Sequence, residues 1–173
     1  MNQSKPSYLS PLTIGFGTYI IISASFIQQI WKFLGQILGK GNVETICIAI
    51  NLIIGLLILC YIIKYRFNLL RFIAVSVILI AAYTFAWRQP YFVEKIHVLE
   101  YGLLGWLATK DLRRFSKINI LQAALFSLLF ALFIGSLDEG FQRLLPYRVG
   151  EMRDVLTNII SGSFGIVLFL ISK

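Results

Sequence analysis

Charged residues are scarce in this chain of 173 residues, where they make up only 14% of the sequence. A soluble domain usually carries about a quarter charged residues, so an ordinary water-facing surface is not expected. Acidic residues number eight, and His97 is the single histidine. A lone histidine with dispersed carboxylates does not predict a metal site, and the sequence leaves any cofactor unidentified.

Cysteine and the common catalytic motifs are also lacking. Cys47 and Cys60 are the two cysteines. Thirteen residues of one predicted helix separate them, a distance of about 20 Å that no disulfide can span. There is no CxxC pair, and there is no HExxH, GxSxG or P-loop lysine motif. A disulfide scaffold and the familiar zinc, hydrolase and nucleotide-binding sites are therefore not indicated.

Long apolar runs take the place of the missing charges. Hydrophobic residues make up 58% of the chain, and its mean hydropathy is +0.79. The run VETICIAINLIIGLLILCYIIKY has no water-facing stripe, and a stretch of about 20 apolar residues matches the bilayer core. We therefore predict an all-α, polytopic transmembrane bundle that forms one domain over residues 1–173. The first apolar stretch follows MNQSKPSYLSPL without an A-x-A site, and we expect it to be a span rather than a removed signal peptide.

The hydrophobic pattern predicts about six spans. The fourth is unusual, because Ile96–Thr109 gives only about 21 Å of helix against a core of about 30 Å, and it contains His97 and Glu100. A helix so short and polar is expected to pack inside the bundle. The predicted spans are about Leu12–Trp31 (with a tail to Gly39), Val43–Ile63, Leu69–Trp87, Glu94–Thr109, Ile118–Leu144 and Arg153–Ser172.

The formal net charge of +8 is carried by basic residues in the short loops between apolar runs. This placement is typical of membrane topology and of contact with anionic lipids, so membrane lipids are the expected partners and nucleic acid is not. If the N-terminus is cytoplasmic and all six spans cross, nine basic residues lie inside and seven outside. If Arg143, Arg148 and Arg153 serve a polar cluster and are not counted, the number of basic residues outside falls to four. Both termini are therefore expected inside.

Polar residues gather at one end of the last three predicted spans. Within each span they recur at i+3 or i+4, so they share a helix face. In an antiparallel bundle the three faces meet at the same end, which is the outer one under this topology. The predicted cluster contains His97, Glu100, Tyr101, Asp138, Glu139, Gln142, Asp154 and Asn158.

Three arginines flank these carboxylates, namely Arg143, Arg148 and Arg153. Charges at membrane depth are costly and are normally paired or functional, so a buried ion-pair network is predicted. A purely structural role stays open. In that reading the arginines only neutralise Glu139 and Asp154, and the histidine and asparagine make ordinary hydrogen bonds at helix ends and between helices.

The same residues carry a family resemblance. EKIHVLEYGLLGWL, followed by GSLDEGFQRLLPYRVGEMRDVLTNIISGSFG, resembles the VanZ-like family of small bacterial membrane proteins. The family pattern is a histidine near a tyrosine at a helix start, a D/S-E-x-x-Q stretch, a proline–x–arginine turn, and a D-x-x-x-N helix with trailing glycines. Tyr147 stands where the family often has a glycine. The resemblance covers about residues 94–170, and the matching positions are His97, Tyr101, Glu139, Gln142, Pro146, Arg148, Asp154, Asn158 and Gly162.

The resemblance implies a multi-pass protein of the bacterial cytoplasmic (inner) membrane. The founding member is linked to low-level teicoplanin resistance, which implies a role at the cell envelope. The resemblance implies no biochemical mechanism.

Three functions remain open. A non-enzymatic envelope protein would hold an anionic lipid head group or a lipid-linked phosphate with Arg143, Arg148 and Arg153. An accessory subunit or assembly factor would use its aromatic surface and the small-residue stripe Ser161–Gly165 to pack against other chains. A membrane enzyme acting on a lipid-linked substrate would draw its acid–base groups from the cluster, namely His97, Glu100, Asp138, Glu139 and Asp154.

Overall fold

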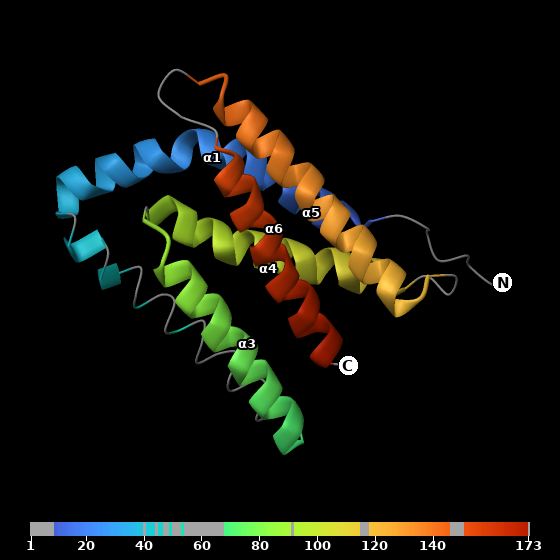
Figure 1. Ribbon diagram of the computed structural model, residues 1–173. Helices are drawn as coiled ribbons and strands as arrows, with labels where there is room; N and C mark the ends of the chain where they lie inside the picture. Colours follow the sequence, from blue (N-terminus) through green and yellow to red (C-terminus); the bar gives the residue numbers. More distant parts are fainter. Residues whose placement is uncertain are drawn as a thin grey trace.

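The structure is a computed structural model that describes residues 9–39, 41–43, 45, 46, 49, 53, 68–90, 92–114, 118–145 and 151–172. All regular secondary structure in these residues is helical, which confirms the predicted all-α class (Figure 1). Most of the expected second span, Val43–Ile63, lies outside the described residues, as do both cysteines. The helices are α1 (Pro11–Leu38), α3 (Leu69–Trp87), α4 (Phe92–Leu112), α5 (Ile120–Gln142) and α6 (Met152–Ile171).

Side chains just outside the helices fix where several of them begin. Asn68 caps α3, because its side chain accepts a hydrogen bond from the Arg71 backbone N–H at 2.9 Å. Asn119 and Gln122 form a reciprocal capping box at the start of α5, with distances of 2.8 and 3.0 Å. These bonds satisfy backbone donors that a helix start leaves without a partner. Helix α1 ends before Gly39, whose φ of 82° is a backbone conformation that favours glycine and stops the helix.

Among the residues that the structure describes, three helices are long and apolar enough to cross a membrane, namely α3, α5 and α6. Helix α1 bends by 51° between its two arms, Pro11–Ile27 and Gln29–Leu38. If the two arms form one span, α1 is a fourth candidate. Within the described part of the chain, this is fewer than the six spans expected. Helix α4 is long enough, with 21 residues, but charged groups such as Glu94, Lys95 and Lys110 lower its hydropathy.

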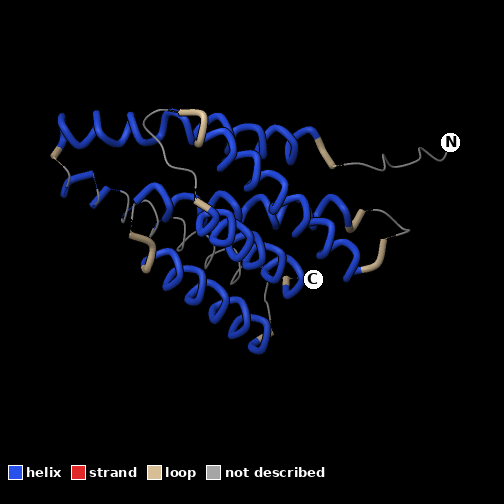
Figure 2. Tube along the Cα trace, turned by 45° about the horizontal axis from the view of Figure 1, so that its top comes forward, coloured by secondary structure: helices blue, strands red, loops and turns tan. Residues whose placement is uncertain are grey.

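Helix α4 contacts every other labelled helix, α1, α3, α5 and α6, as expected for a helix packed inside the bundle. In Figure 1, α6 crosses α4 near its middle and α5 runs beside α6. Figure 2 shows the same arrangement from another direction, with α1 lying along one side of the other helices. Tyr101 and Leu104 from α4 pack with Ile20 from α1 and Ile134 from α5 in the buried core.

Helices α4 and α6 touch through their backbones. A Cβ atom added at Gly165 would lie 1.7 Å from the Gly102 carbonyl oxygen, and one added at Gly105 would lie 2.2 Å from the Gly162 carbonyl oxygen. Only glycine permits so close an approach. The small-residue stripe Ser161–Gly165 lies in this contact, so it packs against a helix of the same chain. Packing of this stripe against other chains stays a prediction.

The start of α1 is joined to the end of α4 by Asp111. Its Oδ2 atom accepts hydrogen bonds from the Ser10 backbone N–H at 2.9 Å, the Ser10 hydroxyl at 2.5 Å and the Thr13 hydroxyl at 2.6 Å. Burial would raise the pKa of the Asp111 carboxyl, but these hydrogen bonds and the Arg114 charge outweigh it and hold the pKa below its usual value. The contact fixes the beginning of α1 against the bundle.

Candidate functional site

The first turns of α4 carry three polar side chains on one face, as the spacing predicts. His97 and Tyr101 are buried, with exposed fractions of 6% and 0%. The His97 Nδ1 atom lies 3.1 Å from Glu100 Oε2, and both side chains are largely shielded from solvent. A histidine and a carboxylate are therefore paired inside the bundle.

Tyr101 connects this face to the end of α5. Its hydroxyl donates a hydrogen bond to Asp138 Oδ2 at 3.1 Å. Gln142 Nε2 then donates to Asp138 Oδ1 at 3.1 Å and to Glu139 Oε1 at 3.2 Å. Asp138, Glu139 and Gln142 are all buried. The amide thus lies between two carboxylates and holds both on the inner face of α5.

Glu139 extends the network to α6. Its Oε2 atom accepts a hydrogen bond from the Glu151 backbone N–H at 3.2 Å. Glu151 is the N-cap residue of α6 and makes no side-chain cap of its own. The carboxylate of α5 therefore satisfies a backbone donor next to the first turn of α6, which positions the start of that helix.

Asn158 lies deeper on α6 and is only 1% exposed. A Cβ atom at Gly135 of α5 would lie 3.3 Å from Asn158 Cβ and 3.6 Å from Tyr101 Cε1, so the glycine leaves room for both side chains. The Asn158 Nδ2 atom is buried and has no hydrogen-bond partner among the described residues.

Arg153 forms the rim of the site, with a side chain that is 51% exposed. Its Nη2 atom lies 2.9 Å from Glu94 Oε1, and its Nε atom lies 3.3 Å from Asp154 Oδ1 and 3.8 Å from Glu151 Oε2. The contact with Glu94 joins α6 to α4. Arg143 is exposed at the C-cap of α5. Arg148, with Pro146 and Tyr147, lies outside the described residues.

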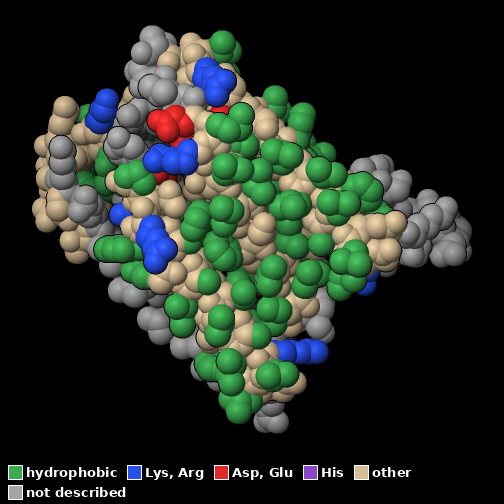
Figure 3. All heavy atoms as spheres, viewed as in Figure 1, with side chains coloured by type: hydrophobic (Ala, Val, Ile, Leu, Met, Phe, Trp, Pro, Cys, Tyr) green, Lys and Arg blue, Asp and Glu red, His purple; other side chains and the backbone are tan. Residues whose placement is uncertain are grey.

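The structure thus brings together the predicted residues of α4, α5 and α6. It places Glu100, Asp138 and Glu139 inside, and Arg143 and Arg153 outside. Figure 3 shows Asp and Glu side chains gathered beside Lys or Arg near one end of the molecule, whereas hydrophobic side chains cover most of the rest of that face. Among the described residues, no group of three or more His, Cys, Asp and Glu side chains has the geometry to hold a metal ion.

Glu94 is the member of this site that the sequence reasoning missed. It lies three residues before His97, so helical spacing already places it on the polar face of α4. Its contact with Arg153 spans 59 positions of the chain, and no local pattern indicates that pairing.

The arrangement offers two kinds of binding group. The buried carboxylates of Glu100, Asp138 and Glu139 accept hydrogen bonds from hydroxyl or amine donors. The guanidinium of Arg153 has five N–H donors in a planar fork that fits phosphate oxygens, and the contacts described above use only part of them.

Comparison with protein families matches most of the chain. A protein-family model described as VanZ/LLP1 matches residues 16–173. The match extends beyond the C-terminal half that carries the motif residues and includes α1 and α3. No curated protein and no solved structure matches the chain.

Proposed function

Because the chain belongs to the VanZ/LLP1 family, and because polar groups of three helices meet at one end of a membrane protein, we propose that this end binds the phosphate-bearing head group of a lipid or lipid-linked compound. The protein would act without catalysis at the envelope of a bacterial cell. It would reside in the cytoplasmic membrane, with both termini inside and the polar end outside. A link to teicoplanin susceptibility would follow from such a role.

The position of Arg153 carries this proposal. Glu94 and Asp154 hold its guanidinium at 2.9 and 3.3 Å, while half of the side chain remains exposed. A side chain fixed in this way loses little conformational freedom when it binds an anion. Arginine also binds phosphate through two parallel hydrogen bonds, which adds geometric selectivity.

The buried interior supports a ligand with more than a phosphate. An anion alone would be repelled by Glu100, Asp138 and Glu139, which lie below the rim and are largely or fully buried. A sugar hydroxyl or an amine next to the phosphate would instead donate hydrogen bonds to these carboxylates. Lipid-linked cell-wall intermediates and amine-bearing phospholipids both have this combination.

The direct test is native mass spectrometry of the full chain titrated with a polyprenyl phosphate sugar, which has both the phosphate and the hydroxyl donors, in neutral detergent. Loss of one phosphate-binding cation is worth about 1 kcal/mol, or roughly fivefold in affinity, so Arg153→Gln should weaken binding by that factor. Arg71→Gln is the matched control, because Arg71 is also exposed but lies in the first turn of α3. Equal binding by wild type and Arg153→Gln would contradict the proposal, and constant co-purification of another chain would favour the subunit function.

A second function has one observation in its favour. His97 Nδ1 and Glu100 Oε2 lie 3.1 Å apart and are shielded from solvent, and a histidine beside a carboxylate is a pair of side chains that can serve in general acid–base catalysis. An enzyme would hydrolyse a polyprenyl diphosphate: His97 would take a proton from water, the water oxygen would bond to the terminal phosphorus, and the P–O bond to the polyprenyl phosphate would break. His97→Gln would abolish the release of inorganic phosphate while leaving head-group binding intact. Absence of turnover in the wild-type protein would remove this function.

A further inference from the structure

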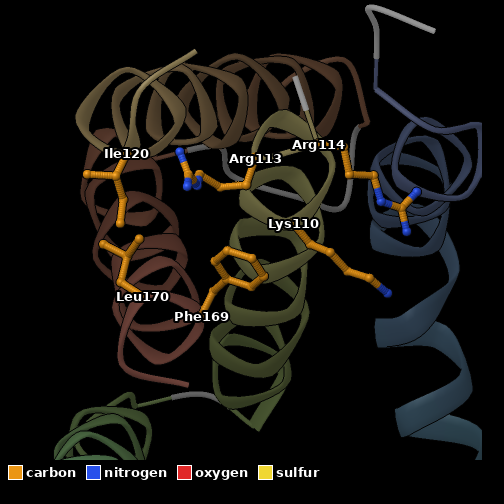
Figure 4. Close-up of a pocket in the computed structure, with 6 residues that line it drawn as sticks. All are labelled: Lys110, Arg113, Arg114, Ile120, Phe169 and Leu170. Atoms are coloured by element: carbon orange, nitrogen blue, oxygen red, sulfur yellow. The ribbon is translucent and has the colours of Figure 1, made fainter. Parts of the chain in front are cut away.

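A second polar feature lies at the start of α5 and the end of α6. It is a cavity of about 370 Å³ where the end of α4, the start of α5 and the end of α6 meet (Figure 4). The polar site described above occupies the end of α5 and the start of α6, so the two features lie at opposite ends of these helices. The cavity is lined by Lys110, Arg113, Arg114, Ile120, Phe169 and Leu170.

The polar lining of this cavity is entirely basic. Arg113 extends toward Ile120, and its Nη1 atom donates a hydrogen bond to the Ile118 carbonyl oxygen at 3.3 Å (Figure 4). Lys110 and Arg114 extend on the other side of α4. Within the described part of the chain, no carboxylate lies within ion-pair distance of Lys110 or Arg113.

One carboxylate reduces this charge only in part. Asp111 Oδ1 lies 3.7 Å from Arg114 Nη1. Its other oxygen, Oδ2, is occupied by hydrogen bonds from Ser10 and Thr13. The cavity therefore keeps a net positive charge, which favours an anionic ligand over a zwitterionic one.

The apolar lining indicates that the anion is attached to a hydrocarbon chain. Ile120 begins α5, and Phe169 and Leu170 lie in the last turn of α6, which are two helices able to cross a membrane. The cavity thus lies where a span meets the head-group region. Trp106 packs edge-to-face on Phe169, with ring centroids 5.5 Å apart, and fixes this wall. Basic side chains at such a boundary keep their charge at the head groups while their stems remain on apolar surface.

We propose that this cavity binds an anionic glycerophospholipid, with the phosphate at Arg113 and an acyl chain along Ile120, Phe169 and Leu170. Lys110 and Arg114 add positive charge from the other side of α4. The site lies at the opposite end of α5 and α6 from Arg153 and does not depend on the function proposed there. It would give the protein a lipid preference in the leaflet that faces the last turn of α6.

The test is native mass spectrometry of the full chain in neutral detergent, titrated separately with phosphatidylglycerol and phosphatidylcholine. The wild type should bind phosphatidylglycerol at least about tenfold more tightly, because more than one cation contributes. Arg113→Gln and Lys110→Gln should each weaken that binding by about fivefold. Arg71→Gln, which changes an exposed arginine of α3 that does not line the cavity, should change it less than twofold.

Several results would overturn the proposal. Equal affinity for the two lipids would do so, as would equal losses in Arg113→Gln and Arg71→Gln, which would show that only total charge matters. Competition by soluble glycerol phosphate at the concentration at which the lipid binds would identify a soluble anion as the occupant. If Arg113→Gln loses its helical circular dichroism, the variant is unfolded and Lys110→Gln is used in its place. Unchanged binding of phosphatidylglycerol by Lys110→Gln then rejects the site.

Discussion

Replacing Gly165 by alanine tests the backbone contact between α4 and α6. The added Cβ would lie 1.7 Å from the Gly102 carbonyl oxygen and 3.0 Å from the Trp106 backbone nitrogen. Backbone atoms cannot rotate away as a side chain can, so the two helices must separate. Overpacking of this kind costs typically about 1–3 kcal/mol, and the short distance to a backbone oxygen places this position at the upper end of the range.

Alanine also has a higher helix propensity than glycine, which offsets about 1 kcal/mol of that cost. The net loss of about 2 kcal/mol corresponds to a decrease in Tm of roughly 4–8 °C for a chain of this size. The measurement is the loss of helical circular dichroism on heating in one detergent. Gly140→Ala is the matched control, because a Cβ atom there meets nothing within 4 Å. That variant should melt at the wild-type temperature or above it.

A Gly165→Ala protein that melts at or above the wild-type temperature would refute the reasoning, since no backbone contact could then exist at this position. A decrease of the same size in Gly140→Ala would refute it as well. It would show that any added methyl group destabilises these helices, whatever its surroundings.

Three further predictions concern the ends of the bundle. Tyr101→Phe should lower stability by about 1–3 kcal/mol in the same melting experiment, because the buried Asp138 carboxylate loses a donor; an unchanged Tm would show that the hydrogen bond does not form. Asp111→Ala should lower stability by about 2–3 kcal/mol, because the hydrogen bonds of Asp111 to the start of α1 are lost. Limited proteolysis should then cleave the start of α1 faster than in the wild type, and a cleavage rate equal to that of the wild type would argue against this contact. A single cysteine is placed at Arg143 or at Arg114 in a chain without its native cysteines. The two cysteines should react with an impermeant maleimide from opposite sides of the membrane. Labelling of both from the same side would rule out this arrangement of α4 and α5.

Much of the helical layout was predictable from hydropathy. The predicted third span, Leu69–Trp87, coincides with α3, and the predicted fifth and sixth spans differ from α5 and α6 by one or two residues at each end. The fourth was predicted too short, as Glu94–Thr109, whereas α4 runs from Phe92 to Leu112. Apolarity marks the part of a helix that suits lipid, but a helix continues through polar residues when neighbouring helices cover it.

The candidate site was predictable to the extent that helical spacing determines it. Spacing and antiparallel order placed His97, Tyr101 and Asp138 at one end, and the structure brings them together; their roles in binding remain predictions. Spacing could not reveal the pairing of Glu94 with Arg153, since it depends on how α6 crosses α4. It also could not reveal that the acidic groups lie inside and Arg143 outside, because a helical repeat gives the face of a residue but not its depth.

The hydrogen bonds of Asp111 also have a consequence for how the protein is made. Ser10 and Thr13 find their acceptor about a hundred positions later in the chain, with separations of 101 and 98 residues. During synthesis, the first helix is therefore complete long before the ribosome has produced the residue that holds its start. Until then these donors have no such acceptor, so the contact that fixes the beginning of α1 forms only after Asp111 has been made.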